Sequence, residues 1–192
     1  WRPGALNAVS EQASVTVSGA VTVHGACEGV AFDACRIEHV GGYGFECADG
    51  ATDVVFRNGT IRDLGAGGVK VWHGCRRCRI EDCEIGDGGH LWMSGVGVLI
   101  GKAAGNSVVH CDIHDFYYTG VSVGFMWGYE ESEAYGNVIE WNHIHDIGKG
   151  VLSDMGGIYL LGNACGTRVR YNRIHGIRSL RYGGWAIYPD EG

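Results

Sequence analysis

The sequence predicts an all-β fold, a single-stranded right-handed parallel β-helix. The first observation is a short pattern that occurs six times: an apolar residue, two variable positions, then Asn, Cys or Gly, one variable position and Ile. The second is a short strand that follows each copy after a polar or glycine-rich stretch. A repeat of about 20 to 50 residues indicates a solenoid, a propeller or an array. Helical stripes are missing and the repeats are too short for propeller blades of about 40 residues, so a β-solenoid remains.

The isoleucines of the pattern predict the core. They are Ile37, Ile61, Ile85, Ile113, Ile144 and Ile174. Stacked coil on coil at the ~4.8 Å spacing of neighbouring strands, their side chains fill a continuous interior. The Asn, Cys or Gly two positions earlier falls at a turn, where stacked Asn amides satisfy the bent backbone. Cys35, Cys83 and Cys111 in this column are therefore interpreted as small packing residues.

A second strand is expected in each coil, and its alternation separates an inner from an outer face. The expected strands are 44–47, 68–71, 95–98, 120–123, 157–160 and 186–189. Val69 and Val71 then point inward, whereas Lys70, Ser122 and Tyr159 point outward. Connections between parallel strands of one sheet are right-handed, which gives the helix its expected hand.

The repeat runs without interruption, so residues 1–192 are expected to form one β-helix domain. Residues 1–28 hold the N-terminal start of the stack, with alternating Val15/Val17 and Val21/Val23, and 29–192 hold about six coils whose loops lengthen in the C-terminal half. The chain opens on Trp1 and ends in a strand-to-turn segment, and a solenoid requires a cap at each end. We therefore expect a truncated piece of a longer helix whose C-terminal cap is missing.

Composition excludes some classes of function. The formal net charge of −7 offers no basic surface for nucleic acid, and no apolar run approaches the ~20 residues of a membrane span. Eight cysteines would suit a disulfide framework, and Cys75-x2-Cys78-x4-Cys83 has a loose resemblance to a zinc site. Structural zinc sites usually show paired short spacings, and Cys83 already belongs to the turn column. Packing thiols are favoured, and no metal site is expected there.

Four insertions interrupt the repeat and indicate that the functional site lies in the C-terminal half. They are 86–94, 125–137, 147–156 and 178–184. Long loops on a rigid scaffold commonly carry binding residues. Trp127 and Tyr129, beside Glu130 and Glu131, offer flat rings and carboxylates of the kind that bind sugars. The alternative is that these rings fold back and cover the stack.

Two aspartates lie in the neighbouring coils. Asp154 precedes the strand that contains Tyr159, and Asp190 follows Tyr188 at a position in register with the apolar Leu161. Tyr159 and Tyr188 are expected to stack in one outward column. A solvated aspartate at a strand end is one interpretation of each acid, and a catalytic carboxylate is the other.

A family resemblance bears on this choice. The segments Ser153-Asp154-Met155-Gly156-Gly157-Ile158-Tyr159 and Ile187-Tyr188-Pro189-Asp190-Glu191-Gly192, together with 118–124 and 142–146, resemble bacterial β-helix proteins of the glycoside hydrolase family 141 type. The resemblance covers roughly residues 28–192. It implies a pectate-lyase-like solenoid, a secreted or periplasmic location, xylanase- or α-L-fucosidase-like activity on plant-type polysaccharide, and Asp154 and Asp190 as the catalytic residues. Pro189 departs from the family, where an aliphatic residue commonly precedes the second Asp.

Glycoside hydrolysis requires two carboxyl groups that flank the scissile bond. If both segments were extended, Asp154 and Asp190 would lie roughly 20 Å apart, so the prediction requires loop 147–156 to fold over the sheet. Glu191 is the reserve. No cofactor is expected. The substrate-binding residues predicted with the acids are Trp127, Tyr129, Tyr159, Trp185, Tyr188, His145 and His175.

Two other functions stay open. A polysaccharide lyase would use calcium and a Lys or Arg base such as Arg181, and the column Asp63, Asp87, Asp115 and Asp146 would supply acids, although Asp is expected there as a turn residue anyway. The chain could instead be a non-catalytic carbohydrate-binding or surface β-helix. His143-x-His145-Asp146 could bind a metal, but a histidine stack along the solvent face is the favoured interpretation and no metal site is predicted.

Overall fold

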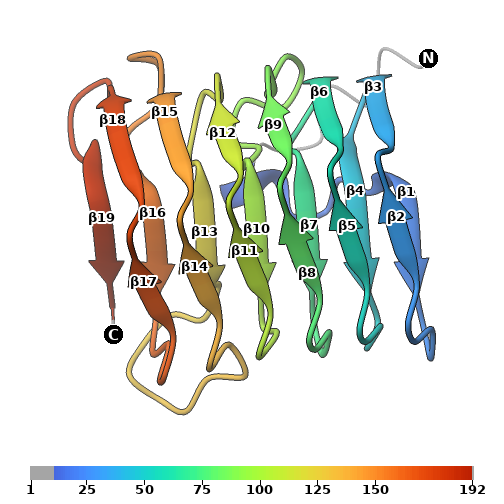
Figure 1. The fold of residues 1–192 in the computed structure, drawn as a ribbon. Coiled ribbons are helices and arrows are strands. Elements are labelled where there is room, and N and C mark those ends of the chain that lie inside the picture. The colour runs from blue at the N-terminus through green and yellow to red at the C-terminus, as the bar shows by residue number, and fades with distance from the viewer. Residues whose placement is uncertain (1–10, 192) are drawn as a thin grey trace.

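The computed structural model describes residues 11–191, which form a parallel β-helix of three sheets (Figure 1). The seven-stranded sheet consists of β1 (Gly19–His24), β4 (Tyr43–Ala48), β7 (Val69–Trp72), β10 (Val98–Gly101), β13 (Val121–Gly124), β16 (Gly156–Leu161) and β19 (Trp185–Asp190). Every pair of neighbours in it is parallel.

Two six-stranded sheets complete each coil. The β2–β17 sheet consists of β2 (Ala31–Asp33), β5 (Val55–Arg57), β8 (Arg79–Glu81), β11 (Ser107–Val109), β14 (Val138–Glu140) and β17 (Arg168–Arg170). The β3–β18 sheet consists of β3 (Arg36–Val40), β6 (Thr60–Leu64), β9 (Glu84–Gly86), β12 (Asp112–His114), β15 (His143–Ile147) and β18 (Arg173–Ile177). The predicted fold class is confirmed. The expected strand 95–98 is wrong by two residues in register: Val98, not Val96, pairs with Val69 and Val121, because the Gly95-Val96-Gly97-Val98 repeat offers two alignments two residues apart.

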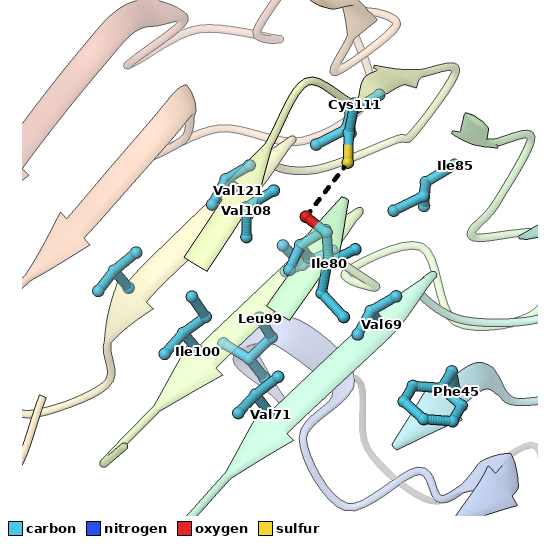
Figure 2. Close-up of a cluster of buried hydrophobic side chains, with 14 of the residues drawn as sticks. Phe45, Val69, Val71, Ile80, Ile85, Leu99, Ile100, Val108, Cys111 and Val121 are labelled. Atoms are coloured by element: carbon cyan, nitrogen blue, oxygen red, sulfur yellow. Dashed lines mark hydrogen bonds between the residues drawn. The ribbon is translucent and has the colours of Figure 1, made fainter. Parts of the chain in front are cut away.

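The isoleucine column forms the predicted core. Ile61 pairs with Ile85, and Ile113 with Ile144, and all four side chains are fully buried. The strands of the other two sheets add Ile80, Val108, Val69 and Val121 to the same interior (Figure 2). A side chain of this size contributes roughly 1.5–3 kcal/mol when it is fully buried, so the stack is the main source of stability.

The turn column also behaves as predicted. The Asn142 side-chain carbonyl accepts a hydrogen bond from the Cys111 N–H at 2.9 Å, and its amide donates to the Val108 carbonyl at 3.0 Å. Cys111 takes the place of Asn in its own coil and directs its thiol at the Ile80 carbonyl, 3.6 Å away (Figure 2). A second ladder, formed by Asn106 and Asn137, lies at another corner and was not predicted.

The aspartate column is a turn column too. Asp63, Asp87, Asp115 and Asp146 have φ between 52° and 58°, in the left-handed region that Asp and Asn tolerate better than most residues. Gly176 continues the column with φ 67°. This conformation accounts for Asp at these four positions, independent of any calcium ion.

An N-terminal strap covers part of the outer face of the seven-stranded sheet. The strap is residues 11–18, and it includes the short 3-10 helix η2 (Gln12–Ser14). Lys70 Nζ donates to the carbonyls of Val15 and Val17 at 3.0 and 2.8 Å. The prediction that Val15 and Val17 begin the strand stack is therefore wrong, because the stack begins at β1. Lys70 and Ser122 belong to the outer side of their strands, yet both are buried.

No helix between residues 11 and 191 is long and apolar enough to cross a membrane.

Candidate active site

A tyrosine pair connects the two predicted catalytic aspartates. Tyr159 in β16 and Tyr188 in β19 are in register, and their rings stack at 4.7 Å between centroids. The Tyr159 hydroxyl donates to Asp190 Oδ2 at 2.6 Å, and the Tyr188 hydroxyl donates to Asp154 Oδ1 at 3.0 Å. Each carboxylate is thus held by one ring of the same stack. Asp190 is in register with Leu161, as predicted.

The loop between β15 and β16 carries Asp154 over the sheet. The Asp154 N–H donates to the Tyr182 carbonyl at 2.7 Å, and its carbonyl accepts the Tyr118 hydroxyl at 2.8 Å. Gly183 allows the loop between β18 and β19 to approach closely, since a Cβ there would lie 2.8 Å from the Met155 nitrogen. The folded loop brings Asp154 within hydrogen-bonding distance of Tyr188, whose ring stacks on the tyrosine that holds Asp190.

Burial and the two acids together suppress ionisation of the tyrosines. Burial, with the charges of Asp154 and Asp190 contributing, raises the pKa of Tyr118 to about 12. Burial is also the main cause of the raised pKa values of Tyr159 and Tyr188, followed for Tyr159 by its hydrogen bond to Asp190. These hydroxyls therefore stay protonated and act as hydrogen-bond donors at neutral pH.

A cavity of about 490 Å³ lies beside Asp154. Its lining consists of Gln12, Leu91, Met93, Ser94, Tyr118, Leu152, Ser153 and Asp154. Two of the insertions predicted from the sequence, 86–94 and 147–156, supply six of these residues, and the strap supplies Gln12. Ser94 donates to the Glu11 carbonyl at 2.7 Å and so fastens the strap to the first insertion.

Comparison with known proteins places the fold in a family. A family described as right-handed β-helix region matches residues 18–188. The chain belongs to the right-handed β-helix family. No curated protein matches it.

Two solved structures share this right-handed β-helix. One is the enzymatically active domain of tailspike protein 2 of bacteriophage CBA120, with a TM-score of 0.61 and 14% identity over 88% of this chain and 25% of that chain. The other is full-length tailspike protein 2 from the Escherichia coli O157:H7 bacteriophage CAB120, with a TM-score of 0.63 and 14% identity over 87% and 22%. The chain spans about a quarter of these structures, and the likeness is one of fold.

The structure places the predicted aromatic residues at two ends of the strands. Trp127 and Tyr129 are exposed on the long loop after β13, at the bottom of Figure 1, whereas the loops after β15 and β18 lie at the top. Trp185 is 39% exposed and contacts Tyr188, with 4.3 Å between ring centroids. Trp185 therefore joins the tyrosine pair directly.

The prediction that the Tyr159 ring contacts the substrate is wrong. Tyr159 is only 1% exposed, because Tyr188 stacks on it and neighbouring segments cover it. Its ring cannot stack on a sugar, although its hydroxyl holds Asp190. Glu191, the reserve acid, is exposed and has a left-handed φ of 53°.

His145 and His175 lie on strands of the β3–β18 sheet, not on the seven-stranded sheet that carries Tyr188 and Asp190. They stack as predicted, with ring centroids 5.3 Å apart. The structure does not bring these two histidines together with Tyr188 and Asp190, because the outer faces of two different sheets of the coil hold the two groups.

Tyr118 and Gln12 were not among the predicted site residues, although the two insertions that supply most of the cavity lining were. Tyr118 precedes β13 in the position that meets the Asp154 loop of the next coil. Gln12 is 106 residues from Tyr118 in the chain, and its amide lies 3.4 Å from the Tyr118 hydroxyl. The tyrosine immediately before a strand, in the coil adjacent to a candidate acid, is a signal that could have identified Tyr118.

The cysteines at 75, 78 and 83 occupy packing positions. All three are buried, and the Cys78 N–H donates a hydrogen bond to Asn106 Oδ1, which belongs to the second asparagine ladder. A hydrogen bond with Cys47, together with burial, raises the pKa of Cys78 to about 12. The Cys83 thiol points at the Glu81 carbonyl, 2.9 Å away.

Proposed function

We propose that this chain is the β-helix of a glycoside hydrolase that acts on a polysaccharide, with Asp154 and Asp190 as its catalytic carboxylates. The observation that carries the proposal is the stacked pair Tyr159 and Tyr188, which ties one carboxylate to each ring. Glycosidic bonds are cleaved between two carboxyl groups, one of which protonates the leaving oxygen while the other attacks the sugar or activates water. Tyrosine donors at both acids fix their orientation for this work.

The surroundings suit a sugar chain. The cavity beside Asp154 combines apolar side chains, such as Leu91 and Met93, with the polar groups of Gln12, Ser94 and Ser153. Concave sites with an apolar lining and a few polar groups are usual for small ligands. Trp185 and Tyr182 are exposed beside Tyr188 and offer flat faces to sugar rings.

Roles for the two acids follow from their positions. Asp154 is exposed and lines the cavity, where it can reach the leaving-group side of a bound glycoside. Asp190 is half-buried and oriented by the buried Tyr159, which suits a nucleophile or a base that activates water. The xylanase- or α-L-fucosidase-like specificity and the secreted or periplasmic location are further parts of the proposal, supported by the family 141 resemblance.

The experiment measures release of reducing sugar from xylan, fucosylated glycans and bacterial surface polysaccharides by the purified chain and its Asp154→Asn and Asp190→Asn variants. Each substitution is expected to lower turnover by at least about a hundredfold, because each removes one partner of the acid–base pair. Binding of the same glycans is expected to change little. Asp115→Asn, an acid of the turn column in an earlier coil, is the matched control and should keep full activity.

A double Asn variant that releases sugar at the parent rate would refute the assignment, and Glu191→Gln would then be compared. Chelator-sensitive release of unsaturated products would identify a lyase instead. Binding without release of sugar by the parent would identify a carbohydrate-binding β-helix, in which the tyrosine-held carboxylates simply accept sugar hydroxyls.

A further inference from the structure

A second cluster of chemistry-bearing side chains lies on the outer face of the β3–β18 sheet. His143 and His145 alternate with the buried Ile144 along β15, so both face outward. Asp112 in the preceding coil is in register with His143. Neighbouring coils thus bring two imidazoles and one carboxylate together, away from the sheet that carries Asp190.

These three side chains converge on one point. Asp112 Oδ1 lies 3.1 Å from His143 Nδ1 and 3.0 Å from His145 Nε2, and all three atoms lie within 4.8 Å of one another. Ligands of a tetrahedral Zn²⁺ ion, each at about 2.0–2.2 Å, are separated by roughly 3.3 Å. The two carboxylate–imidazole separations are within a few tenths of an ångström of that value, so a small divalent ion fits between the carboxylate and each imidazole.

The contacts of His145 cannot all be hydrogen bonds of a neutral ring. Its Nε2 faces Asp112 and its Nδ1 lies 2.9 Å from Asp146 Oδ2, so both nitrogens meet a carboxylate oxygen. A neutral imidazole donates to only one of them, and a protonated imidazole donates to both. A metal ion bound at Nε2 takes the place of the proton there and leaves the Nδ1 proton for Asp146.

We propose that Asp112, His143 and His145 bind a divalent transition-metal ion, with Zn²⁺ as the best fit. Imidazole nitrogens favour zinc, copper and nickel, whereas calcium and magnesium favour sets of oxygen ligands. The three side chains are partly exposed, so the site is open to metal from solvent and keeps a coordination position for water.

Outer contacts already hold the ligands in place. Asp146 orients His145 from the opposite ring nitrogen, the carboxylate–histidine–metal arrangement that is common in zinc proteins. His143 Nε2 meets His175 Nε2 at 2.8 Å, so the next coil supports the other imidazole. Since the ligands come from β12 and β15, the ion links two coils and stabilises the folded state when it binds.

The experiment titrates the tag-free, metal-stripped chain with Zn²⁺ in a calorimeter and follows Co²⁺ by its visible absorption. One equivalent is expected to bind and to raise the melting temperature. Asp112→Asn, His143→Asn and His145→Asn should each weaken binding at least tenfold. Asp146→Asn, which touches only the far side of His145, should weaken it about 10–100-fold, the usual effect of an outer hydrogen-bond partner. Circular dichroism checks that each variant is folded.

Two control variants separate this site from other histidines. His110 forms an exposed pair with Asp82 on the β2–β17 sheet side, and His90 forms a looser group with Asp63 and Asp87. His110→Gln and His90→Gln should bind Zn²⁺ like the parent. Three results would each overturn the proposal. The parent could fail to bind Zn²⁺ or Co²⁺, the Asp112 and His145 variants could bind as tightly as the parent, or binding could be lost only in His90→Gln. Because Asp154 and Asp190 are unchanged throughout, these outcomes are independent of glycosidase activity.

Discussion

Lys70→Met is expected to unfasten the N-terminal strap and destabilise the whole chain. Lys70 is 3% exposed, and its three donor directions are used by Glu46 Oε1 at 2.9 Å and by the carbonyls of Val15 and Val17. Glu46 is also buried, and its second oxygen accepts the Gly19 N–H at 2.7 Å. The pair thus joins the strap, β1, β4 and β7.

The magnitude follows from what the substitution leaves behind. Methionine keeps most of the volume of lysine, so the cost comes from the unpaired buried carboxylate of Glu46 and from two unpartnered carbonyls. Breaking a buried ion pair by removing one partner costs about 3–5 kcal/mol. For a chain of this size each kcal/mol lowers the melting temperature by about 2–4 °C, so a decrease of roughly 6–20 °C is expected.

The assay is thermal and urea unfolding of the parent, Lys70→Met, Glu46→Met and the double variant. The double variant removes both charges, and it should be more stable than Lys70→Met by about 1 kcal/mol or more. Amide exchange at Thr16 and Gly19 should accelerate in Lys70→Met, since both amides depend on the anchored strap. A loss below about 1 kcal/mol, with unchanged exchange, would refute the idea that this pair fastens the strap.

Three further predictions concern the ladder, the aromatic surface and the tyrosines. Asn142→Ala should lower the free energy of unfolding by about 2–5 kcal/mol, because the Cys111 N–H and the Val108 carbonyl each lose a buried partner. Asn172 is more exposed, so Asn172→Ala should lower it by less. Equal losses in the two variants would contradict this reason. Trp185→Ala should weaken oligosaccharide binding by ~1–3 kcal/mol if the Trp185 ring stacks on a sugar, a magnitude taken from the stacking of nucleic-acid bases on aromatic rings. Tyr159 is buried, so Tyr159→Phe should keep oligosaccharide binding and lose turnover. Isothermal titration measures the binding, and release of reducing sugar measures the turnover. The pKa of Tyr118 is raised to about 12 from an unfolded value near 10, so its contribution to stability is fully present below about pH 10 and is lost as the pH rises toward 12. Tyr118→Phe should therefore flatten the fall in melting temperature over this pH range. An unchanged slope would contradict the assignment.

The coil and, apart from the strand at 98–101, its register could be predicted from the sequence because each depends on residues that repeat at short spacing. Ile113 pairs with Ile144 and Leu161 with Asp190, as the aligned repeats require. In a solenoid each coil contacts only its neighbours, so the column in which a residue stands fixes its partners. The same reasoning predicted the stack of Tyr159 and Tyr188 and the insertions at 86–94 and 147–156 that form the cavity.

Only the tertiary structure decided which outward residues are covered and which meet. Alternation assigns Lys70 and Tyr159 to the outer side of the sheet, but the strap and the neighbouring coil bury both. The strap lies 53 residues from Lys70 at Val17, and no repeat encodes that contact. His143 and His145 could be recognised in the sequence as possible metal ligands, but Asp112 could not, because its approach to them depends on rotamers and on the fit between coils. Sequence periodicity determines the backbone path of this protein, whereas long-range packing determines its sites.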